Sequence, residues 1–335
     1  MNLYSLLGIE KEKPTVFTFD IFPFKEHEYT EFWKFVVERQ YIWFRRFVLN
    51  KPYPWTRDPI LQKYRFTNVY RELDKGTIYI IEKLKPIQKD RRNVLFNVFV
   101  YRIYNKHRFF EKVNDGRPLD IDEFDVYEFI NSLDKVIENE ESVYSNAYLT
   151  YPVVVKPDYR PHEKHVQHAF LIDWFRERID EFLDTIDSAE DPREFMNLFM
   201  SIKGIKDFIS YEFFTDLTYF KFFKQGWTDN DFVNIGKGAR WGLNIMVFNK
   251  DSNDFLMKPE EYEYLAYKLR DEMERALKDL DLYEVWMTIY YKDAFTNVPF
   301  LSVRNIEHSL CEFRKYYRLK YYKKGRKRYY TPPRR

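Results

Sequence analysis

Cysteine is almost absent from this chain of 335 residues, since Cys311 is the only one. One cysteine cannot form a disulfide within the chain, so a disulfide-stapled fold is excluded and a cytoplasmic location is expected. Long apolar runs are lacking as well: none reaches the roughly 18 residues that span a membrane. The start, MNLYSLLGIEKEKP, has no basic residues followed by an apolar stretch, which argues against a secretory signal. No membrane partner is expected.

Glycine is scarce, with nine residues, and the phosphate-binding pattern G-x-x-x-x-G-K-S/T does not occur. We therefore expect no ATP-binding kinase core and no cofactor. The stretch HEKHVQH places His162, His165 and His168 three residues apart. Positions three apart drift by about 60° around a helix, and no cysteine is nearby, so no metal site is predicted.

Aromatic residues are abundant at 20%, with 28 Tyr and 32 Phe. Either they build a core of large rings, or some are exposed to stack on nucleic-acid bases. The net charge of +2 is unevenly distributed, because residues 311–335 hold 11 Lys or Arg and one acid. The rest of the chain holds 44 basic and 52 acidic residues. A basic end on an acidic body indicates either contact with a polyanion or a solvated tail.

Helical periodicity dominates the pattern, so the predicted class is mostly α. Residues 14–24 read as a short strand or extended arm. We expect an N-terminal arm (1–29), a helical domain of one or two lobes (30–322) and a basic tail (323–335). Helices are predicted at residues 28–51, 60–84 (one or two, with Gly76 as a joint), 91–105, 122–139, 166–186, 191–201, 205–217, 258–281 and 303–320.

One glycine lies between two helical patterns in SIKGIKDFISYEFFTDL (201–217). Gly204 would permit a tight turn and leave backbone N–H groups exposed at the start of the next helix, where an anion binds well. A helix–hairpin–helix holds a DNA phosphate in this way, and Lys203 and Lys206 would strengthen the site. We predict such a motif at residues 192–220. A plain helix C-cap is the alternative.

A second glycine-rich stretch is NIGKGARWGL (234–243). Gly236, Gly238 and Gly242 alternate with Lys237 and Arg240, as in a loop that brings its backbone close to a phosphate or a base. A tight surface turn with two solvated cations is the alternative.

Four blocks in the same order resemble a known family: PWTRDPILQKYRFTNVYRELDKG (54–76), SIKGIKDFISYEFFTDL, GKGARWGL, and IEHSLCEFRKYYR with GRKRYY (within 306–330). They are similar to the helical domain of 5-hydroxymethyluracil DNA kinases. The same domain occurs in α-glutamyl/putrescinyl thymine pyrophosphorylases, also described as amino acid:DNA transferases, which belong to viral pathways that hypermodify thymine. The domain is considered related to helix–hairpin–helix DNA glycosylases. The resemblance spans roughly residues 30–330.

The resemblance implies a glycosylase-like helical fold, DNA as partner, and a small amine or amino acid as co-substrate. It also implies other DNA-modification enzymes as partners, in a bacterial cell infected by a virus. The chain departs from the family pattern in three ways. The kinase P-loop is absent, Lys237 replaces the proline of an expected GPGA, and Arg314 replaces the acid of an expected CEFDKY. A kinase role, or a catalytic role for that acid, cannot be carried over.

The implied substrate is a thymine whose 5-methyl group bears a pyrophosphate. Its replacement by an amine needs cations or backbone donors for the leaving group, a general base for the amine, and access to the base, for example by flipping. Asp216, about three turns beyond Gly204, and Glu312 are the candidate bases. An ordinary salt bridge is the alternative for Asp216.

Asn68, Arg71 and Glu72 would share one face of a helix, and Glu312, Lys315 and Arg318 would share another, with His308 one turn earlier. The first set either lines a pocket or is a solvated face, and the second is either a phosphate clamp or an ion-pair ladder. The predicted substrate- and phosphate-binding residues are Asn68, Arg71, Lys237, Arg240, Lys315, Arg318 and Arg326. The predicted DNA-binding residues are Lys203, Gly204, Lys206, Gly236, Gly238, Lys323, Lys324 and Arg328.

Three hypotheses follow. The chain transfers an amine or amino acid onto pyrophosphorylated 5-hydroxymethyluracil in DNA; or it is a DNA glycosylase or lyase that acts on a modified base; or it is a non-catalytic DNA-binding module that partners a separate kinase. For the first, one cleft is expected to gather Asn68, Arg71, Asp216, Lys237, Arg240, Glu312, Lys315 and Arg318. The basic tail, with Tyr329 and Tyr330 as stacking rings, is expected to add sequence-independent, salt-dependent DNA affinity.

Overall fold

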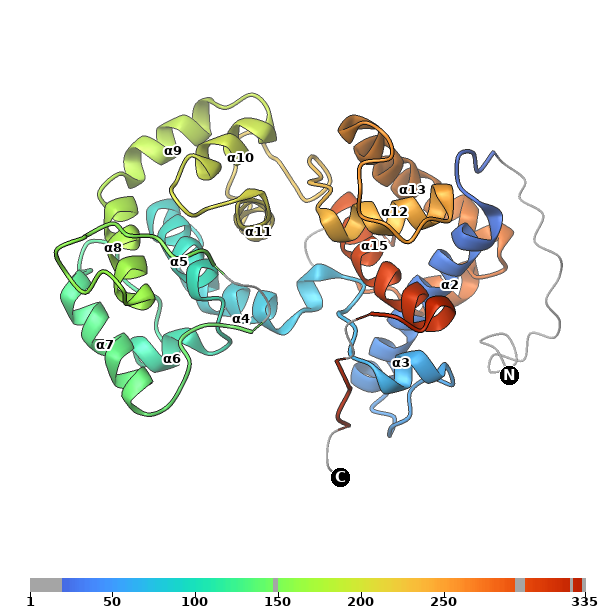
Figure 1. Ribbon diagram of the computed structural model, residues 1–335, viewed down its shortest axis with the longest axis horizontal. Coiled ribbons are helices and arrows are strands. Elements are labelled where there is room, and N and C mark those ends of the chain that lie inside the picture. The colour runs from blue at the N-terminus through green and yellow to red at the C-terminus, as the bar shows by residue number, and fades with distance from the viewer. Residues whose placement is uncertain (1–19, 147–149, 293–298, 326–327, 333–335) are drawn as a thin grey trace. The chain divides into compact units, whose positions relative to one another are not determined.

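The structure is a computed structural model that describes residues 20–146, 150–292, 299–325 and 328–332 (Figure 1). Within these ranges the chain is mostly helical, and its β pairing is limited to one isolated antiparallel bridge between Tyr64 and Tyr329. The predicted mostly-α class is confirmed. The glycosylase-like arrangement of the helices stays a prediction. None of the helices in these ranges has the length and apolar character needed to cross a bilayer.

The chain forms two compact units. We name them the discontinuous unit (Met1–Leu73 and Val233–Arg335) and the inserted unit (Asp74–Phe232). In Figure 1 the inserted unit runs from cyan through green to yellow, and the discontinuous unit combines the blue start of the chain with its orange and red end. The sequence left open whether the helical domain has one lobe or two.

The discontinuous unit is built around two long helices that lie far apart in the sequence. Phe32 on one of them meets Phe313 on the other with ring centroids 5.4 Å apart. Ser302 caps the second of these helices by accepting the N–H of Asn305 at 3.2 Å. The elements of this unit are α2 (Glu26–Trp43), the π-helix η1 (Phe44–Val48), α3 (Pro59–Lys63), the 3₁₀ turn η2 (Arg71–Leu73), α12 (Lys237–Phe248), α13 (Pro259–Asp279), α14 (Tyr283–Ile289), α15 (Val303–Tyr317) and the π-helix η4 (Arg318–Tyr322).

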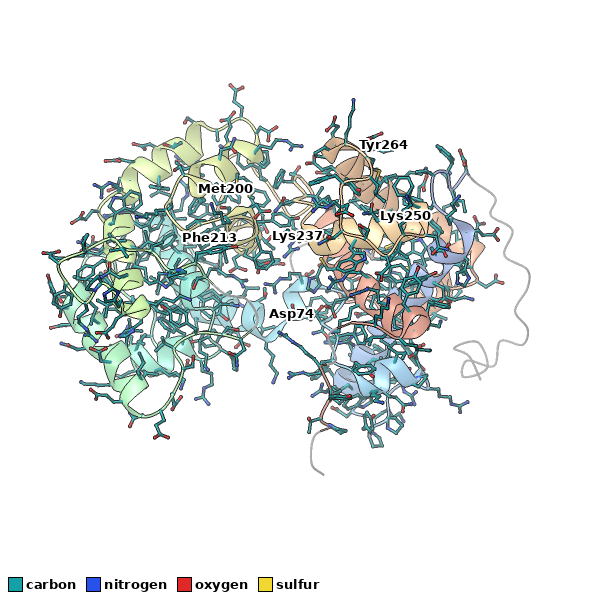
Figure 2. The ribbon with its side chains drawn as sticks, viewed as in Figure 1. Asp74, Met200, Phe213, Lys237, Lys250 and Tyr264 are labelled. Atoms are coloured by element: carbon teal, nitrogen blue, oxygen red, sulfur yellow. The ribbon has the colours of Figure 1, made fainter. Side chains whose placement is uncertain are left out.

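The glycine-rich stretch is helical from Lys237 onward, where a loop was predicted. Gly236 is the N-cap of α12, and the helix continues through Gly238 and Gly242. A Cβ at Gly238 would lie 2.6 Å from the Sγ of Cys311, and one at Gly242 would lie 2.5 Å from the carbonyl oxygen of Leu310. These two glycines therefore let α12 approach α15 closely, which side chains with a Cβ would prevent. Figure 2 shows Lys237 at the beginning of α12 and Lys250 just beyond its end.

The inserted unit has a core of stacked rings. Phe99 lies 4.0 Å from Phe175 and 5.2 Å from Phe213 by ring centroid. Aromatic side chains of this unit thus build its core, because each of them buries a large apolar area. Its elements are α4 (Lys75–Leu84), η3 (Lys85–Ile87), α5 (Arg91–Tyr104), α6 (Phe109–Val113), α7 (Val126–Glu138), α8 (Lys164–Arg176), α9 (Ile179–Ser188), α10 (Pro192–Met200) and α11 (Asp207–Thr218).

Three further predicted elements differ from the structure. The helix expected over residues 166–186 is divided into α8 and α9. Residues 20–24 form a turn rather than a strand, closed by Phe24 N–H donating to Ile21 O at 2.9 Å, and residues 14–19 lie outside the described ranges. The stretch 64–70 is not helical, and Gly76 lies inside α4 instead of at a joint.

Candidate substrate and nucleic-acid site

The non-helical segment 64–70 is held by tertiary hydrogen bonds in place of helical ones. Arg65 N–H donates to Arg328 O at 2.8 Å, and Thr67 N–H donates to the Glu312 carboxylate at 3.1 Å. The predicted shared helical face of Asn68, Arg71 and Glu72 is therefore wrong, because tertiary partners satisfy the backbone that a helix would have paired internally.

Glu312 and Lys315 nevertheless meet this segment from α15. Lys315 Nζ donates to the carbonyl oxygen of Arg65 and lies 3.4 Å from Glu312 Oε2. The ammonium also sits over the Phe66 ring, 4.3 Å from its centroid. Two residues predicted from the last block of the sequence are thus in direct contact with the first block.

Lys315 is a largely buried cation. Burial lowers the pKa of its ammonium, and nearby Arg328 and Arg314 act in the same direction, while Glu312 opposes them. A site in which several cations repel one another gains from the arrival of an anion, because the anion relieves that repulsion. At Lys315 the attraction of the Glu312 carboxylate opposes this repulsion, so the part it plays toward phosphate stays a prediction.

Arg71 and Asn68 lie on the same segment but make different contacts. The backbone N–H of Arg71 donates to the Asn305 side-chain oxygen at 2.7 Å, and the Asn305 amide donates to Glu72 at 3.3 Å. The Asn68 amide donates to Leu73 O at 2.8 Å, and its oxygen accepts from Arg39 at 3.1 Å. Asn68 therefore shapes the segment that carries Arg71.

A buried polar group on α15 was missed by the sequence analysis. Arg304, Asn305 and Glu307 are each less than a tenth exposed, and Arg304 is paired with Glu307. The Cys311 thiol donates to Glu307 at 3.4 Å, and burial raises the pKa of this thiol. The stretch VRNIEHS held the signal that could have revealed them. Its polar residues interrupt the apolar stripe that a buried helix normally shows. Buried charges of this kind need partners.

The predicted phosphate-binding cations on α12 and η4 make local contacts of their own. Arg240 Nε donates to Asn253 O at 2.7 Å, and its guanidinium lies 3.6 Å from the Phe255 ring centroid. Arg318 pairs with Asp251 at 2.7 Å and lies over Trp241 at 4.2 Å. Lys237 is exposed. These contacts do not link Arg240, Arg318 or Lys237 to Lys315.

Asp216 belongs to the inserted unit, where it is fully buried. Arg102 donates to both of its carboxylate oxygens, from Nε at 2.6 Å and from Nη2 at 2.5 Å, and Nη1 of Arg102 lies 3.0 Å from Glu212. The carboxylate is thus engaged in an ion pair within the core. Its catalytic role, and a cleft that also includes the residues of the discontinuous unit, stay predictions.

Gly204 lies at a turn between α10 and α11, as expected, with a φ of +87°. A Cβ there would also lie 2.3 Å from Cγ1 of Val153, so both conformation and space favour glycine. Lys203 and Lys206 are exposed, and Lys203 Nζ donates to Val154 O at 3.4 Å. The assignment of this turn as a helix–hairpin–helix that contacts DNA stays a prediction.

The basic tail is partly folded onto the discontinuous unit. Tyr330 N–H donates to Lys63 O at 3.0 Å, next to the bridge between Tyr64 and Tyr329. Lys323 and Lys324 are exposed, and Lys323 Nζ donates to Lys320 O at 2.6 Å. Arg326, one of the predicted phosphate ligands, lies outside the described residues.

The three histidines of HEKHVQH do not converge. His168 is buried between the Tyr144 hydroxyl at 2.8 Å and Tyr151 O at 2.9 Å. His165 lies 2.8 Å from Asp134, and with Glu163 these side chains form a group of metal-ligand type. Arg160 pairs with both carboxylates of that group, at 2.7 Å and 2.5 Å, so each carboxylate already has a cationic partner.

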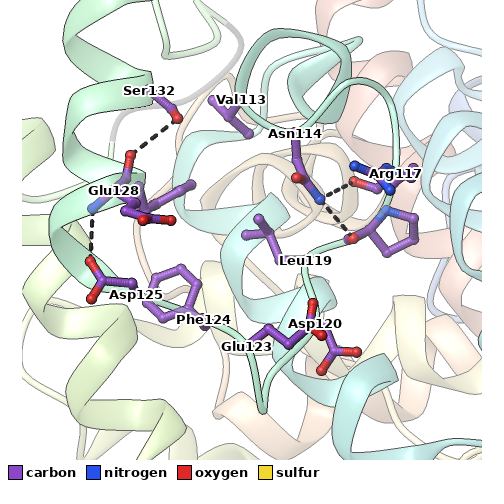
Figure 3. Close-up of a pocket in the computed structure, with 12 residues that line it drawn as sticks. Val113, Asn114, Arg117, Leu119, Asp120, Glu123, Phe124, Asp125, Glu128 and Ser132 are labelled. Atoms are coloured by element: carbon purple, nitrogen blue, oxygen red, sulfur yellow. Dashed lines mark hydrogen bonds between the residues drawn. The ribbon is translucent and has the colours of Figure 1, made fainter.

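A pocket of about 420 Å³ opens in the inserted unit (Figure 3). Acidic residues line much of it, including Asp120, Glu123 and Glu128. Its polar groups partly serve the local fold, since the Asn114 amide donates to Arg117 O at 3.1 Å and to Pro118 O at 2.9 Å. Carboxylates repel phosphate, so this pocket is poorly suited to the anionic substrate that the resemblance implies.

A family model and a curated relative agree in what this chain is similar to. A model of the family "5-hmdU DNA kinase, helical domain" matches residues 26–326. The chain is similar to the 5-hmdU DNA kinase of Bacillus phage SP10, at 26% identity over 242 residues, or 67% of this chain. The match spans only 38% of the phage protein's length. No solved structure matches the chain. With the family match covering nearly all the described residues, this chain belongs to the family of the 5-hmdU DNA kinase helical domain.

Proposed function

We propose that this chain is a DNA-base hypermodification enzyme that transfers an amine or amino acid onto pyrophosphorylated 5-hydroxymethyluracil in DNA. It would act in the cytoplasm of a bacterial cell infected by a virus. The observation that carries the proposal is the contact of Glu312 and Lys315 with segment 65–67, inside a chain that belongs to this family. A carboxylate and a partly buried cation lie side by side here, and they would serve as the general base and the leaving-group cation of the reaction.

The reaction replaces one bond by another. The nitrogen of a neutral amine attacks the methylene carbon on C5 of the base, and the bond from that carbon to the pyrophosphate oxygen breaks. The electron pair of that bond leaves with the pyrophosphate, and the proton lost by the new secondary ammonium goes to a general base. Glu312 is our candidate for this base. Lys315, with Arg314 and Arg328 nearby, would stabilise the charge on the leaving pyrophosphate.

The contacts of the other predicted residues fit a positioning role. Asn68 holds the turn that leads to Arg71, and Asn305 of α15 accepts the backbone N–H of Arg71. Arg71, Arg304 and Glu307 are all buried, and Arg304 is paired with Glu307. We propose that these residues position the base-binding segment rather than react with substrate.

A non-catalytic role has two observations in its favour. The chain matches 38% of a phage protein named as a kinase, and it lacks the P-loop pattern, so it could correspond to a DNA-presenting module that partners a separate kinase. This alternative predicts DNA binding without any change in the DNA.

Mass spectrometry of nucleosides separates the possibilities. The purified chain is incubated with DNA that contains pyrophosphorylated 5-hydroxymethyluracil and with candidate amines, such as putrescine or glutamate, and the DNA is then digested. A new amine adduct with released pyrophosphate supports transfer. A free base supports a glycosylase, and unchanged DNA supports the binding module.

Variants then assign the residues. Glu312→Gln should abolish adduct formation while DNA binding persists, and Lys315→Met should slow it with weaker pyrophosphate binding. Lys278→Gln is a matched control, because Lys278 is an exposed lysine on α13 whose contacts, with Glu274 and the Tyr283 ring, are local. Full adduct formation by Glu312→Gln would exclude this residue as the base.

A further inference from the structure

The π-helix η1 follows α2 directly, and three apolar side chains are exposed at its end. Phe47, Val48 and Leu49 are each about half exposed, at 52%, 49% and 45%. Single-turn π-helices occur frequently at functional sites. This short apolar stretch begins a surface that we name the basic–aromatic surface, which consists of residues 45–65 together with residues 328–330.

The surface is strongly positive. Residues 45–65 contain six Lys or Arg and one acid, Asp58. That carboxylate is already used, because one oxygen caps α3 through Ile60 N–H at 2.7 Å and the other accepts from the Tyr316 hydroxyl at 2.6 Å. Lys51, Lys63 and Arg65 are exposed, and none of them takes part in an ion pair among the described residues. Their charges are therefore available to a polyanion.

The C-terminal segment supplies the rings. The backbone of residues 328–330 pairs with residues 63–65, through Arg65 N–H to Arg328 O at 2.8 Å and Tyr330 N–H to Lys63 O at 3.0 Å. Tyr330 packs inward against Tyr53 with ring centroids 6.1 Å apart. Tyr329 instead lies outward, 57% exposed.

Tyr329 has the setting of a stacking ring. It rests on Tyr64 at 5.4 Å, and Lys63 Nζ lies 6.0 Å from its centroid. A partly exposed ring that is supported by another ring and has a lysine close to it can receive a base while nearby cations contact the adjoining phosphates. A hydrophobic protein partner would not need this alternation of charge and ring.

The surface is also continuous with the candidate site, because Lys315 donates to the carbonyl oxygen of Arg65. Arg65 thus belongs to the surface through its exposed side chain and to the site through its backbone. A strand bound along the surface would lead directly to Glu312 and Lys315.

We propose that the basic–aromatic surface binds the DNA strand that carries the target base, with phosphates against Lys51, Lys63 and Arg65 and an unpaired base stacked on Tyr329. The proposal deepens the proposed function and rests on DNA being the substrate. Residues 328–330 of the predicted basic tail are a folded part of this surface, and the sequence left open whether the tail contacts a polyanion or is solvated.

The test is DNA binding by the full chain, measured by fluorescence anisotropy with labelled single-stranded DNA and with a duplex of the same sequence, at several salt concentrations. The surface variant is Lys51→Gln/Lys63→Gln/Arg65→Gln. The matched control, Lys25→Gln/Lys258→Gln/Lys278→Gln, removes three exposed charges elsewhere on the same unit. Thermal melting checks that both fold.

The surface variant should lose at least tenfold in affinity for single-stranded DNA. Its slope of log K against log salt should become shallower by about 0.7 for each lost phosphate contact, while the control variant should bind like the parent. Tyr329→Ala should lose roughly 5- to 100-fold on single-stranded DNA, less on the duplex, with an unchanged slope. Tyr329→Phe keeps the ring and should bind normally.

Equal losses in the surface and control variants would overturn the proposal, since they would reflect net charge alone. Unchanged binding by Tyr329→Ala would overturn the stacking contact. The adduct assay separates this proposal from the proposed function. If no adduct forms but the surface variant loses binding, the surface stands and the transfer reaction fails. If an adduct forms with an unchanged KM for DNA in the surface variant, the reaction stands and the surface fails.

Discussion

Arg102 on α5 binds both carboxylate oxygens of Asp216 on α11, at 2.6 Å and 2.5 Å, inside the inserted unit. Both side chains are almost fully buried, and Glu212 shares the same guanidinium. Removal of one partner from a buried pair leaves an uncompensated charge, which costs more than the pair itself contributes.

Asp216→Asn should therefore destabilise the protein by about 3–5 kcal/mol. Chemical denaturation of the variant and the parent gives the difference in free energy of unfolding. Asp207→Asn, in the exposed first turn of α11, is the matched control and should change stability by less than about 1 kcal/mol. A stable Asp216→Asn variant that forms no adduct would instead identify Asp216 as a catalytic residue.

Gly242→Ala should destabilise the packing of α12 on α15. The added Cβ would lie 2.5 Å from the Leu310 carbonyl oxygen, and a backbone atom cannot rotate away. We expect a loss of about 1–3 kcal/mol from overpacking, larger than the gain of about 1 kcal/mol in helix propensity. Denaturant unfolding measures the change.

Gly236→Ser is the control for that variant. Its Cβ meets no atom within 4 Å, its φ of −68° suits any residue, and serine is a better N-cap than glycine. It should be neutral or slightly stabilising. If Gly242→Ala proved as stable as the parent, the close approach of the two helices would not depend on glycine.

His168 should make stability depend on pH. Burial lowers the pKa of its imidazole to about 4, and nearby Lys164 and His165 act in the same direction, while the hydrogen bond to Tyr151 opposes them. The unfolded chain binds a proton near pH 6.5, so it holds more protons than the folded chain between the two pKa values. The contribution of His168 is complete above about pH 6.5 and is lost as the pH falls toward about 4.

The expected slope is about 1.4 kcal/mol per pH unit within that window. The free energy of unfolding is measured against pH for the parent and for His168→Gln, which keeps a donor for Tyr151 O but does not titrate. The difference between the two curves isolates the histidine. Parallel curves would show that the imidazole is not buried as a neutral group.

Lys315 should make pyrophosphate binding sensitive to alkaline pH. Burial lowers the pKa of this ammonium below the usual value near 10.4, so its charge is lost earlier than that of an exposed lysine as the pH rises. Affinity for pyrophosphate, measured by calorimetry between neutral pH and about pH 10, should fall through this range. Lys315→Arg keeps its charge there and should flatten the profile. A profile shared by both proteins would place the titrating group elsewhere.

Helices were predictable because their periodicity is long and regular, as α13 and α15 illustrate. Segment 64–70 was not, since its backbone partners, Glu312 and Arg328, lie more than 200 residues away in the sequence. The prediction of a loop at the glycine stretch was wrong for the same reason. Gly238 and Gly242 allow close packing against α15, and the local sequence does not reveal that partner.

Prediction of the candidate site was limited in the same way, by contacts that only the folded chain reveals. Glu312 and Lys315 were found because a helical repeat places them on one side of a charged helix. Asn305 and Glu307 were missed because their role depends on burial, which only the packed unit reveals. Asp216 was singled out by its spacing from Gly204, and its pairing with Arg102 could not be read from that spacing.

The interrupted order of the discontinuous unit has a consequence for the nascent chain. Its helix α2 is synthesised early, but the surface that covers Phe32 arrives only with Phe313 of α15, after the whole inserted unit has emerged. At about 5–20 residues per second, α2 waits on the order of 10–50 seconds for its partner. During that interval the apolar face of α2 lacks this partner and remains a target for chaperones on the ribosome.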